Sequence, residues 1–213
     1  MPPRRRTAVE LNSRKISIRD ALELEPPIFK LGVVGDSEAG KTTLVNRLLQ
    51  RPLPQQRTQG VGAYIAALQT NPSEHVALVD GGGEEYVQQF QVAEYADALC
   101  VVLDHNRSHV DEAVDPRRLD KSLEFQRNLR GYIRDVRLAN RPLVWILVNK
   151  RDLWEKLDEQ AVLSFRETIK AIEHDWVHSN LAREVVVLNH SNMIGDDVAA
   201  FHALVVRHCG REG

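Results

Sequence analysis

The chain has 213 residues, a formal net charge of −2, and 43% hydrophobic and 27% charged residues, which is ordinary for one soluble globular domain and leaves little room for two. The near-neutral charge gives no general attraction to nucleic acids or membrane surfaces, and two cysteines cannot form a disulfide framework. No apolar run reaches the roughly 20 residues that span a bilayer, and no lipidation motif is recognisable, so we expect a cytoplasmic protein without a lipid anchor or transmembrane segment.

Residues 1–27 are polar, begin with a basic cluster and end at Pro26-Pro27. Because no apolar residues in this segment are spaced to pack against a core, we predict a flexible N-terminal arm. The alternative is a short basic contact with an acidic partner. Residues 28–210 are predicted to form one domain.

From residue 28 onward, short apolar runs alternate with stretches of helical spacing. The runs typical of buried strands are 28–34, 98–103, 142–148 and 184–188, and two further strands, 61–68 and 75–79, are predicted to form a hairpin around the polar turn 69–73. Apolar residues recur at helical spacing in 86–93, 162–176 and 198–208. This alternation predicts an α/β fold with a mostly parallel sheet, one antiparallel edge strand and helices on both faces.

A glycine-rich loop with a lysine follows the first strand and precedes a helical stretch. The pattern G-x-x-x-x-G-K-[ST] is matched by Gly35, Asp36, Ser37, Glu38, Ala39, Gly40, Lys41 and Thr42, and Thr43 follows as a further candidate for contact with the phosphates. Such a loop points backbone N–H groups and a helix N-terminus at phosphate oxygens, the lysine reaches the outer phosphates, and the threonine hydroxyl can bind Mg²⁺. The sequence therefore predicts a nucleoside phosphate site.

The triple glycine after strand 75–79 has two interpretations. It is either an unspecialised turn or a backbone segment that contacts a phosphate and moves when the phosphate is lost. The charged run 105–118, further along the chain, is predicted to be a solvated loop; since it follows a strand on the ligand side of the sheet, contact with a partner is the alternative.

The strand 142–148 ends in Asn149-Lys150-Arg151-Asp152, at the sheet edge where open α/β sheets hold ligands. The carboxylate of Asp152 can accept hydrogen bonds from N1–H and the 2-amino group of guanine, whereas adenine would leave it unpaired. The stem of Lys150 can lie over the base, and Asn149 can tie this loop to the phosphate loop. Guanine is the predicted base.

Taken together, the segments GDSEAGKTTL, VDGGG and NKRD resemble, in order and spacing, the Ras-like branch of the P-loop GTPases. The phosphate loop is most similar to that of Rab proteins, and the resemblance covers about residues 28–208. It implies a P-loop three-layer sandwich with a six-stranded sheet and five flanking helices, and GTP, GDP and Mg²⁺ as ligands.

The resemblance also implies roles for single residues. Thr58 would close over Mg²⁺ and the γ-phosphate. The alternative is that Thr58 is a solvated loop threonine without a ligand. Asp80 would hold Mg²⁺ through a water molecule, and the Gly83 N–H would donate to the γ-phosphate. Ser191 and Asn192 are the candidates for the degenerate serine–alanine element near the base.

Glu84 stands where hydrolysing members of the family usually carry a glutamine that orients the attacking water. At about 5 Å from the γ-phosphate and an effective dielectric of about 20, its charge costs on the order of 3 kcal/mol. Either hydrolysis is therefore slow, or Glu84 or Glu85 acts as a base on the water in a geometry that another group completes. Arg57 is the candidate for that group, as an arginine supplied in cis; the alternative is a surface arginine.

Three functions remain open from the sequence. The first is a Mg²⁺-dependent GTP switch that hydrolyses GTP slowly and presents residues 55–65 and 80–95 to an effector and to regulators of the GAP and GEF type. The second is a GTP-bound scaffold that scarcely hydrolyses. The third is a P-loop ATPase or nucleoside kinase, against which the guanine-type loop argues.

Overall fold

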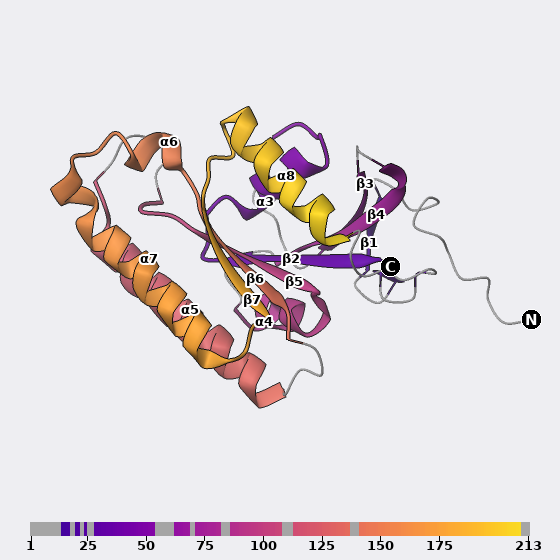
Figure 1. Ribbon diagram of the computed structural model, residues 1–213, viewed down its shortest axis with the longest axis horizontal. Helices are drawn as coiled ribbons and strands as arrows, with labels where there is room; N and C mark the ends of the chain where they lie inside the picture. The colour runs from indigo at the N-terminus through magenta and orange to yellow at the C-terminus, as the bar shows by residue number, and fades with distance from the viewer. Residues whose placement is uncertain are drawn as a thin grey trace, which may run out of the picture.

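A computed structural model describes residues 14–17, 20–21, 24, 28–53, 62–68, 71–81, 86–107, 113–136 and 141–209 (Figure 1). Within these residues the chain forms one mixed sheet of seven strands, β1 to β7, and six helices, α3 to α8. The α/β prediction is confirmed, and one strand and one helix are present beyond the six and five that the resemblance implied.

The strand order across the sheet is β1-β3-β4-β2-β5-β6-β7. The strands are β1 (Lys15–Ile16), β2 (Phe29–Gly35), β3 (Gly62–Leu68), β4 (Asn71–Asp80), β5 (Ala98–Leu103), β6 (Leu143–Val148) and β7 (Glu184–Asn189). The neighbouring strands from β4 to β7 pair in parallel, while β3 is antiparallel to both β1 and β4. The antiparallel pairing is therefore confined to one side of the sheet.

The central strands have a simple physical origin. Every residue of β5 and β6 is buried, as expected for parallel strands that are covered on both faces. Their near-continuous apolar sequences made these strands predictable, and the predicted ranges agree with the observed ones to within one residue.

Helices cover the sheet in two layers. One face packs against α4 (Tyr86–Tyr95), α5 (Pro116–Val136) and α7 (Glu159–Ser179), and the other against α3 (Lys41–Leu48) and α8 (Gly195–Cys209). In Figure 1, α5 and α7 lie side by side along one flank and α8 crosses the opposite face. Asp158 begins α7 by accepting a hydrogen bond from the Ala161 N–H at 2.8 Å.

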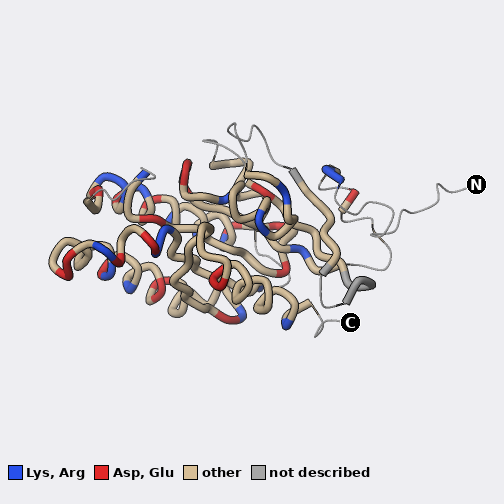
Figure 2. Tube along the Cα trace, turned by 90° about the horizontal axis from the view of Figure 1, so that it is seen from above, with Lys and Arg blue, Asp and Glu red and all other residues tan. Residues whose placement is uncertain are grey.

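Two helices correct the sequence-based expectations. The predicted solvated loop 105–118 overlaps α5, and Arg118 in its first turn is 1% exposed. The short helix α6 (Arg151–Trp154) was not predicted; it directly follows Asn149 and Lys150 and contains the last two residues, Arg151 and Asp152, of the predicted base-recognition loop. Basic and acidic positions are interspersed along the described helices (Figure 2).

The described residues of the segment 1–27 depart from the expectation of a flexible arm. Lys15 and Ile16 pair with Tyr64 and Ala63 of β3, and Ala21 is buried within the same core as α4 and α5. Leu24, the other described apolar residue of this segment, is 2% exposed. This part of the segment therefore belongs to the folded domain.

The hairpin prediction is confirmed by the antiparallel pairing of β3 and β4, but its turn is shorter than 69–73. Strand β4 already begins at Asn71, so Pro72 lies near the start of a strand, where its missing N–H is tolerated. Among the residues that the structure describes, no helix is both long and apolar enough to cross a bilayer.

Candidate functional site

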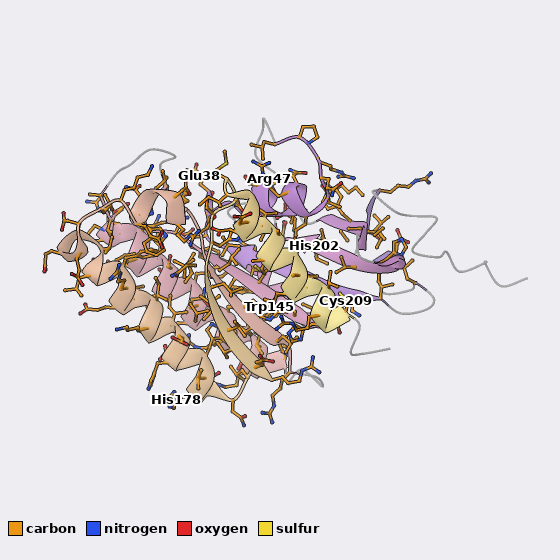
Figure 3. The ribbon with its side chains drawn as sticks, turned by 45° about the horizontal axis from the view of Figure 1, so that its top comes forward. Glu38, Arg47, Trp145, His178, His202 and Cys209 are labelled. Atoms are coloured by element: carbon orange, nitrogen blue, oxygen red, sulfur yellow. The ribbon has the colours of Figure 1, made fainter. Side chains whose placement is uncertain are left out.

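The carboxyl ends of the parallel strands bring the predicted site residues to one edge of the sheet. The strand β2 lies between β4 and β5. After β2 the chain first forms β3 and β4 on one side of it, and then β5, β6 and β7 on the other side. This reversal of strand order is where open α/β sheets bind ligands, and the loop after β2 occupies it. Figure 3 shows Glu38 and Arg47 at this end of the molecule and His178 at the opposite end.

Two glycines allow the backbone of the loop 35–40 to approach its neighbours closely. Gly40 has a φ of +100°, and a Cβ there would lie 2.3 Å from Nδ2 of Asn149. Gly35 has a φ of +145°, and a Cβ there would lie 2.3 Å from the carbonyl oxygen of Val102. Glu38 also adopts a left-handed conformation, with φ +64°. The chain must therefore be glycine at both ends of this loop.

The loop leads directly into α3, whose first turn has no side-chain cap and no acidic residue. Its first N–H groups and its dipole therefore remain suited to an anion. Thr43 continues this first turn, and Ala39 closes the loop by donating to the Asp36 carbonyl at 3.3 Å.

Lys41 lies inside the loop. Its ammonium donates to the carbonyl oxygens of Gly35 at 2.9 Å and Asp36 at 2.8 Å, and the residue is buried. Burial lowers the pKa of Lys41 from 10.5 to about 8, although the nearby carboxylates of Asp80 and Asp36 favour the charged form. A buried ammonium group of this kind suits an anionic ligand, because a nearby negative charge would offset the cost of burial and favour the protonated form of Lys41.

Thr42 and Asp80 join the loop to the end of β4. The hydroxyl of Thr42 donates to Oδ2 of Asp80 at 2.9 Å. A hydroxyl and a carboxylate together are oxygen ligands of the kind that Mg²⁺ prefers when phosphates and water complete its shell. Within the described residues no group of three or more His, Cys, Asp or Glu side chains is arranged to hold a metal.

The predicted base-recognition loop touches the phosphate loop directly. Nδ2 of Asn149 donates to the carbonyl of Ala39 at 2.8 Å, and Nδ2 of Asn192 donates to the carbonyl of Gly40 at 3.0 Å. The two amides are also joined, since the Asn192 N–H donates to Oδ1 of Asn149 at 3.2 Å. The predicted tie through Asn149 is present, and Asn192 adds a second one.

Asp152 lies in α6, and the hydroxyl of Ser191 donates to its Oδ1. Ser191 is itself held by its N–H, which donates to Oδ2 of Asp197 at 2.8 Å. The other oxygen of that carboxylate accepts from Arg151 at 2.8 Å. The two predicted elements around residues 149–152 and 191–192 therefore form one structural unit.

A buried charge network was not predicted from the sequence. The guanidinium of Arg118 forms ion pairs with Asp36 at 2.9 Å and Asp104 at 2.6 Å. Asp104, at the end of β5, also pairs with Lys150 at 2.7 Å, and Lys150 donates to the carbonyl of Asn106 at 2.5 Å. Two signals were available in the sequence. Asp104 comes directly after a buried strand, and Arg118 stands at helical spacing from the apolar residues Phe125 and Leu129.

Gln89 is a second residue that the sequence did not reveal. This fully buried side chain of α4 accepts a hydrogen bond from the Gly35 N–H at 2.9 Å. The helix that follows the triple glycine is therefore connected to the phosphate loop. Four predicted site residues, Arg57, Thr58, Gly83 and Glu84, lie outside the residues that the structure describes.

Residues 30–150, more than half of the chain, match the family model described as "50S ribosome-binding GTPase". The chain belongs to this GTPase family. A curated relative, the Ras-related protein RABG3b of Arabidopsis thaliana, is 29% identical over 86 residues, and a plasmid recombination enzyme of Streptococcus agalactiae is 28% identical over 95 residues. These matches cover 39% and 40% of the chain, and only 42% and 19% of the respective relatives.

Solved structures show the same fold at low identity. The mammalian SRP receptor structure superposes with a TM-score of 0.59 at 22% identity, covering 84% of this chain and 98% of that one. The elongation factor SelB of Methanococcus maripaludis, in complex with the GTP analogue GPPNHP, gives 0.56 at 16% identity, covering 86% of this chain and 34% of that one. This GTPase-family chain therefore has the fold of a small P-loop GTPase, and its predicted nucleotide-binding loops lie at the carboxyl edge of its sheet.

Proposed function

We propose that this GTPase-family chain is a Mg²⁺-dependent guanine-nucleotide switch that hydrolyses GTP slowly. The observation that carries the proposal is the direct bonding between the two loops that would hold the ends of a nucleotide. Asn149 and Asn192 fix the phosphate loop against the loop that carries Asp152. One ligand with a phosphate end and a guanine end would satisfy both.

The base end supports guanine over adenine. Asp152 offers a carboxylate that can accept from N1–H and the 2-amino group, a pair of donors that adenine lacks. This argues against the third possibility, a P-loop ATPase or nucleoside kinase.

The phosphate end supports Mg²⁺. Thr42 and Asp80 would hold the ion, and Thr58 would join them. When bound, Mg²⁺ would neutralise charge on the phosphate oxygens. Lys41 would contribute a second positive charge from inside the loop.

The rate of hydrolysis is the part of the proposal that depends on Glu84. A carboxylate at this position adds negative charge beside the γ-phosphate and cannot donate a hydrogen bond while ionised. Slow turnover follows. A GTP-bound scaffold is the second candidate, and it is favoured by the same residue.

Partner contact is proposed for residues 55–65 and 80–95. In a switch, these would be presented differently in the GTP and GDP states to an effector and to regulators of the GAP and GEF type. Gln89 gives this idea a structural basis, because it links α4 to the phosphate loop.

The nucleotide carried by the purified protein tests the proposal. Chromatography of the denatured protein should yield GDP for a slow switch and GTP for a scaffold, whereas an adenine nucleotide would overturn both. Loading with GTP and following single-turnover phosphate release, with and without Mg²⁺, then measures the rate. A protein that retains no guanine nucleotide and gains none from millimolar GDP does not perform the proposed function.

A further inference from the structure

Arg118 is among the most deeply buried charged residues that the structure describes. It belongs to the first turn of α5, on the face that packs against the sheet, and it carries its charge to the carboxyl edge. Nη1 lies 2.9 Å from Oδ2 of Asp36, and Nε lies 2.6 Å from Oδ1 of Asp104. Burying such a charge is costly unless it is paired and positioned well, so both contacts are needed.

Each of these two carboxylates belongs to a different part of the nucleotide site. Oδ1 of Asp36 accepts the Ser37 N–H at 2.8 Å and so shapes the phosphate loop. Oδ2 of Asp104 pairs with Lys150 at 2.7 Å and so fixes the lysine of the base-recognition loop. The contacts run from the phosphate loop, through α5 and the end of β5, to the base-recognition loop.

The four side chains form a neutral set of two carboxylates and two cations. Removing Arg118 would leave a net negative charge buried beside the loop that must accept an anionic phosphate. The set is also separate from the hydrogen bonds that Asn149 and Asn192 make to the same loop. The ends of the site are therefore joined by two independent connections, one of amides and one of charges.

We propose that Arg118 is a positioning residue for nucleotide binding, which couples the phosphate loop to the base-recognition lysine through Asp36 and Asp104. The inference rests on the proposed guanine-nucleotide function and adds a residue far from both sequence motifs. Arginine suits the role, because its planar fork can bridge two carboxylates in fixed positions and a lysine cannot.

The test compares the release of a fluorescent GDP analogue from the full chain and from three variants, in Mg²⁺, by displacement with excess GDP. Arg118→Met removes the charge and keeps the length, and Arg118→Lys keeps the charge without the fork. Trp176→Phe is the matched control, because its indole donates to Gln126 of the same helix α5 at 2.8 Å while lying outside the network. Urea unfolding of each variant is measured in parallel.

Arg118→Met should release the analogue at least tenfold faster, and Arg118→Lys at least threefold faster. The control, Trp176→Phe, should change the release rate by less than twofold, even if it lowers the free energy of unfolding as much as the Arg118 substitutions do. The inference is overturned if release simply follows the loss of stability across the variants. Should Arg118→Met fail to fold, Arg118→Lys carries the same comparison.

A double variant tests the coupling itself. If Arg118 acts through Asp104 on Lys150, Arg118→Met combined with Lys150→Met should accelerate release by clearly less than the product of the single effects. A full product means that the two residues act independently, and the inference fails. If the unmodified chain binds GDP and the Arg118 substitutions leave the release rate unchanged, only this inference is rejected. If the unmodified chain does not bind guanine nucleotides, the proposed function is rejected as well.

Discussion

At the scale of single residues, side-chain amides hold much of the site together. Gln89, Asn149 and Asn192 each bond to the main chain of the phosphate loop. A side-chain amide offers a donor and an acceptor but carries no charge. It can therefore fix a loop without adding a charge near Lys41 and the predicted ligand. Asn149 uses both groups, donating to Ala39 and accepting from Asn192.

Asp152→Asn should exchange the base preference of the site. An amide at this position can donate to a base oxygen but cannot accept two donors from guanine. We therefore expect the affinity for GDP to fall by about 100-fold or more, and the affinity for xanthosine diphosphate to rise relative to that for GDP. Competition of both nucleotides against a fluorescent GDP analogue measures this, and an unchanged ratio would remove Asp152 from the base site.

His190 should make the stability of the protein sensitive to acid. Burial lowers the pKa of its ring below 6.5, against the opposing hydrogen bond to Asn192. The unfolded chain therefore binds a proton that the folded chain resists, so stability is fully present above pH 6.5 and is lost as the pH falls through the lowered folded pKa.

Urea unfolding between pH 8 and 5 measures this loss. A His190→Gln variant should show a shallower decline, because Gln does not titrate; His202, whose pKa burial also lowers, titrates in both proteins and cancels in the comparison. Equal slopes for the two proteins would contradict the assignment.

At the scale of elements, apolar continuity decided what the sequence could predict. The strands β2, β5 and β6 and the loops at their ends were predictable. Strands β5 and β6 are fully buried and β2 is buried except at Lys30, so their sequences are almost entirely apolar, and the loops have fixed spacing. The first turn of α5 was not predictable, because its most buried side chain is Arg118, and a charged residue indicates solvent unless its partners are known. The pairing of β1 was equally hidden, since two residues carry no periodicity.

Leu24 tests whether the N-terminal segment contributes to folding. Because its side chain is buried, Leu24→Ala should lower the free energy of unfolding by about 2–5 kcal/mol. The same substitution at Leu163, which is exposed on α7, is the control and should change it by about 0.5 kcal/mol or less. Equal small effects in urea unfolding would mean that residues 1–27 behave as the arm that their composition suggests.

At the scale of the whole molecule, the chemistry is gathered at one edge of the sheet while the rest of the domain supports it. The cores on the two faces are separate clusters, one under α4, α5 and α7 and one under α3 and α8. The phosphate loop contacts both layers, through Gln89 and Arg118 on one side and through α3 on the other. A change in nucleotide state would therefore act on both layers at once.

Turnover is a property of this whole arrangement. If Arg57 completes the geometry in cis, Arg57→Ala should lower single-turnover GTP hydrolysis at least tenfold with little change in GTP affinity, as expected for a group that acts on the transition state. Phosphate release from GTP-loaded protein measures the rate, and equilibrium titration measures the affinity. An unchanged rate would leave Arg57 as a surface residue.

The indole of Trp154 has a practical consequence. It is 3% exposed, packs edge-on against Phe165, and donates from Nε1 to the carbonyl of Asn149 at 3.1 Å. All three tryptophans belong to the hydrophobic cores, but the indole of Trp154 bonds to the predicted base-recognition loop, whereas that of Trp176 donates to Gln126 of α5. We therefore expect a rearrangement of this loop to change the environment of Trp154. The unlabelled protein thus contains its own emission probe for ligand exchange, with Trp154→Phe as the blank against which the signal is read.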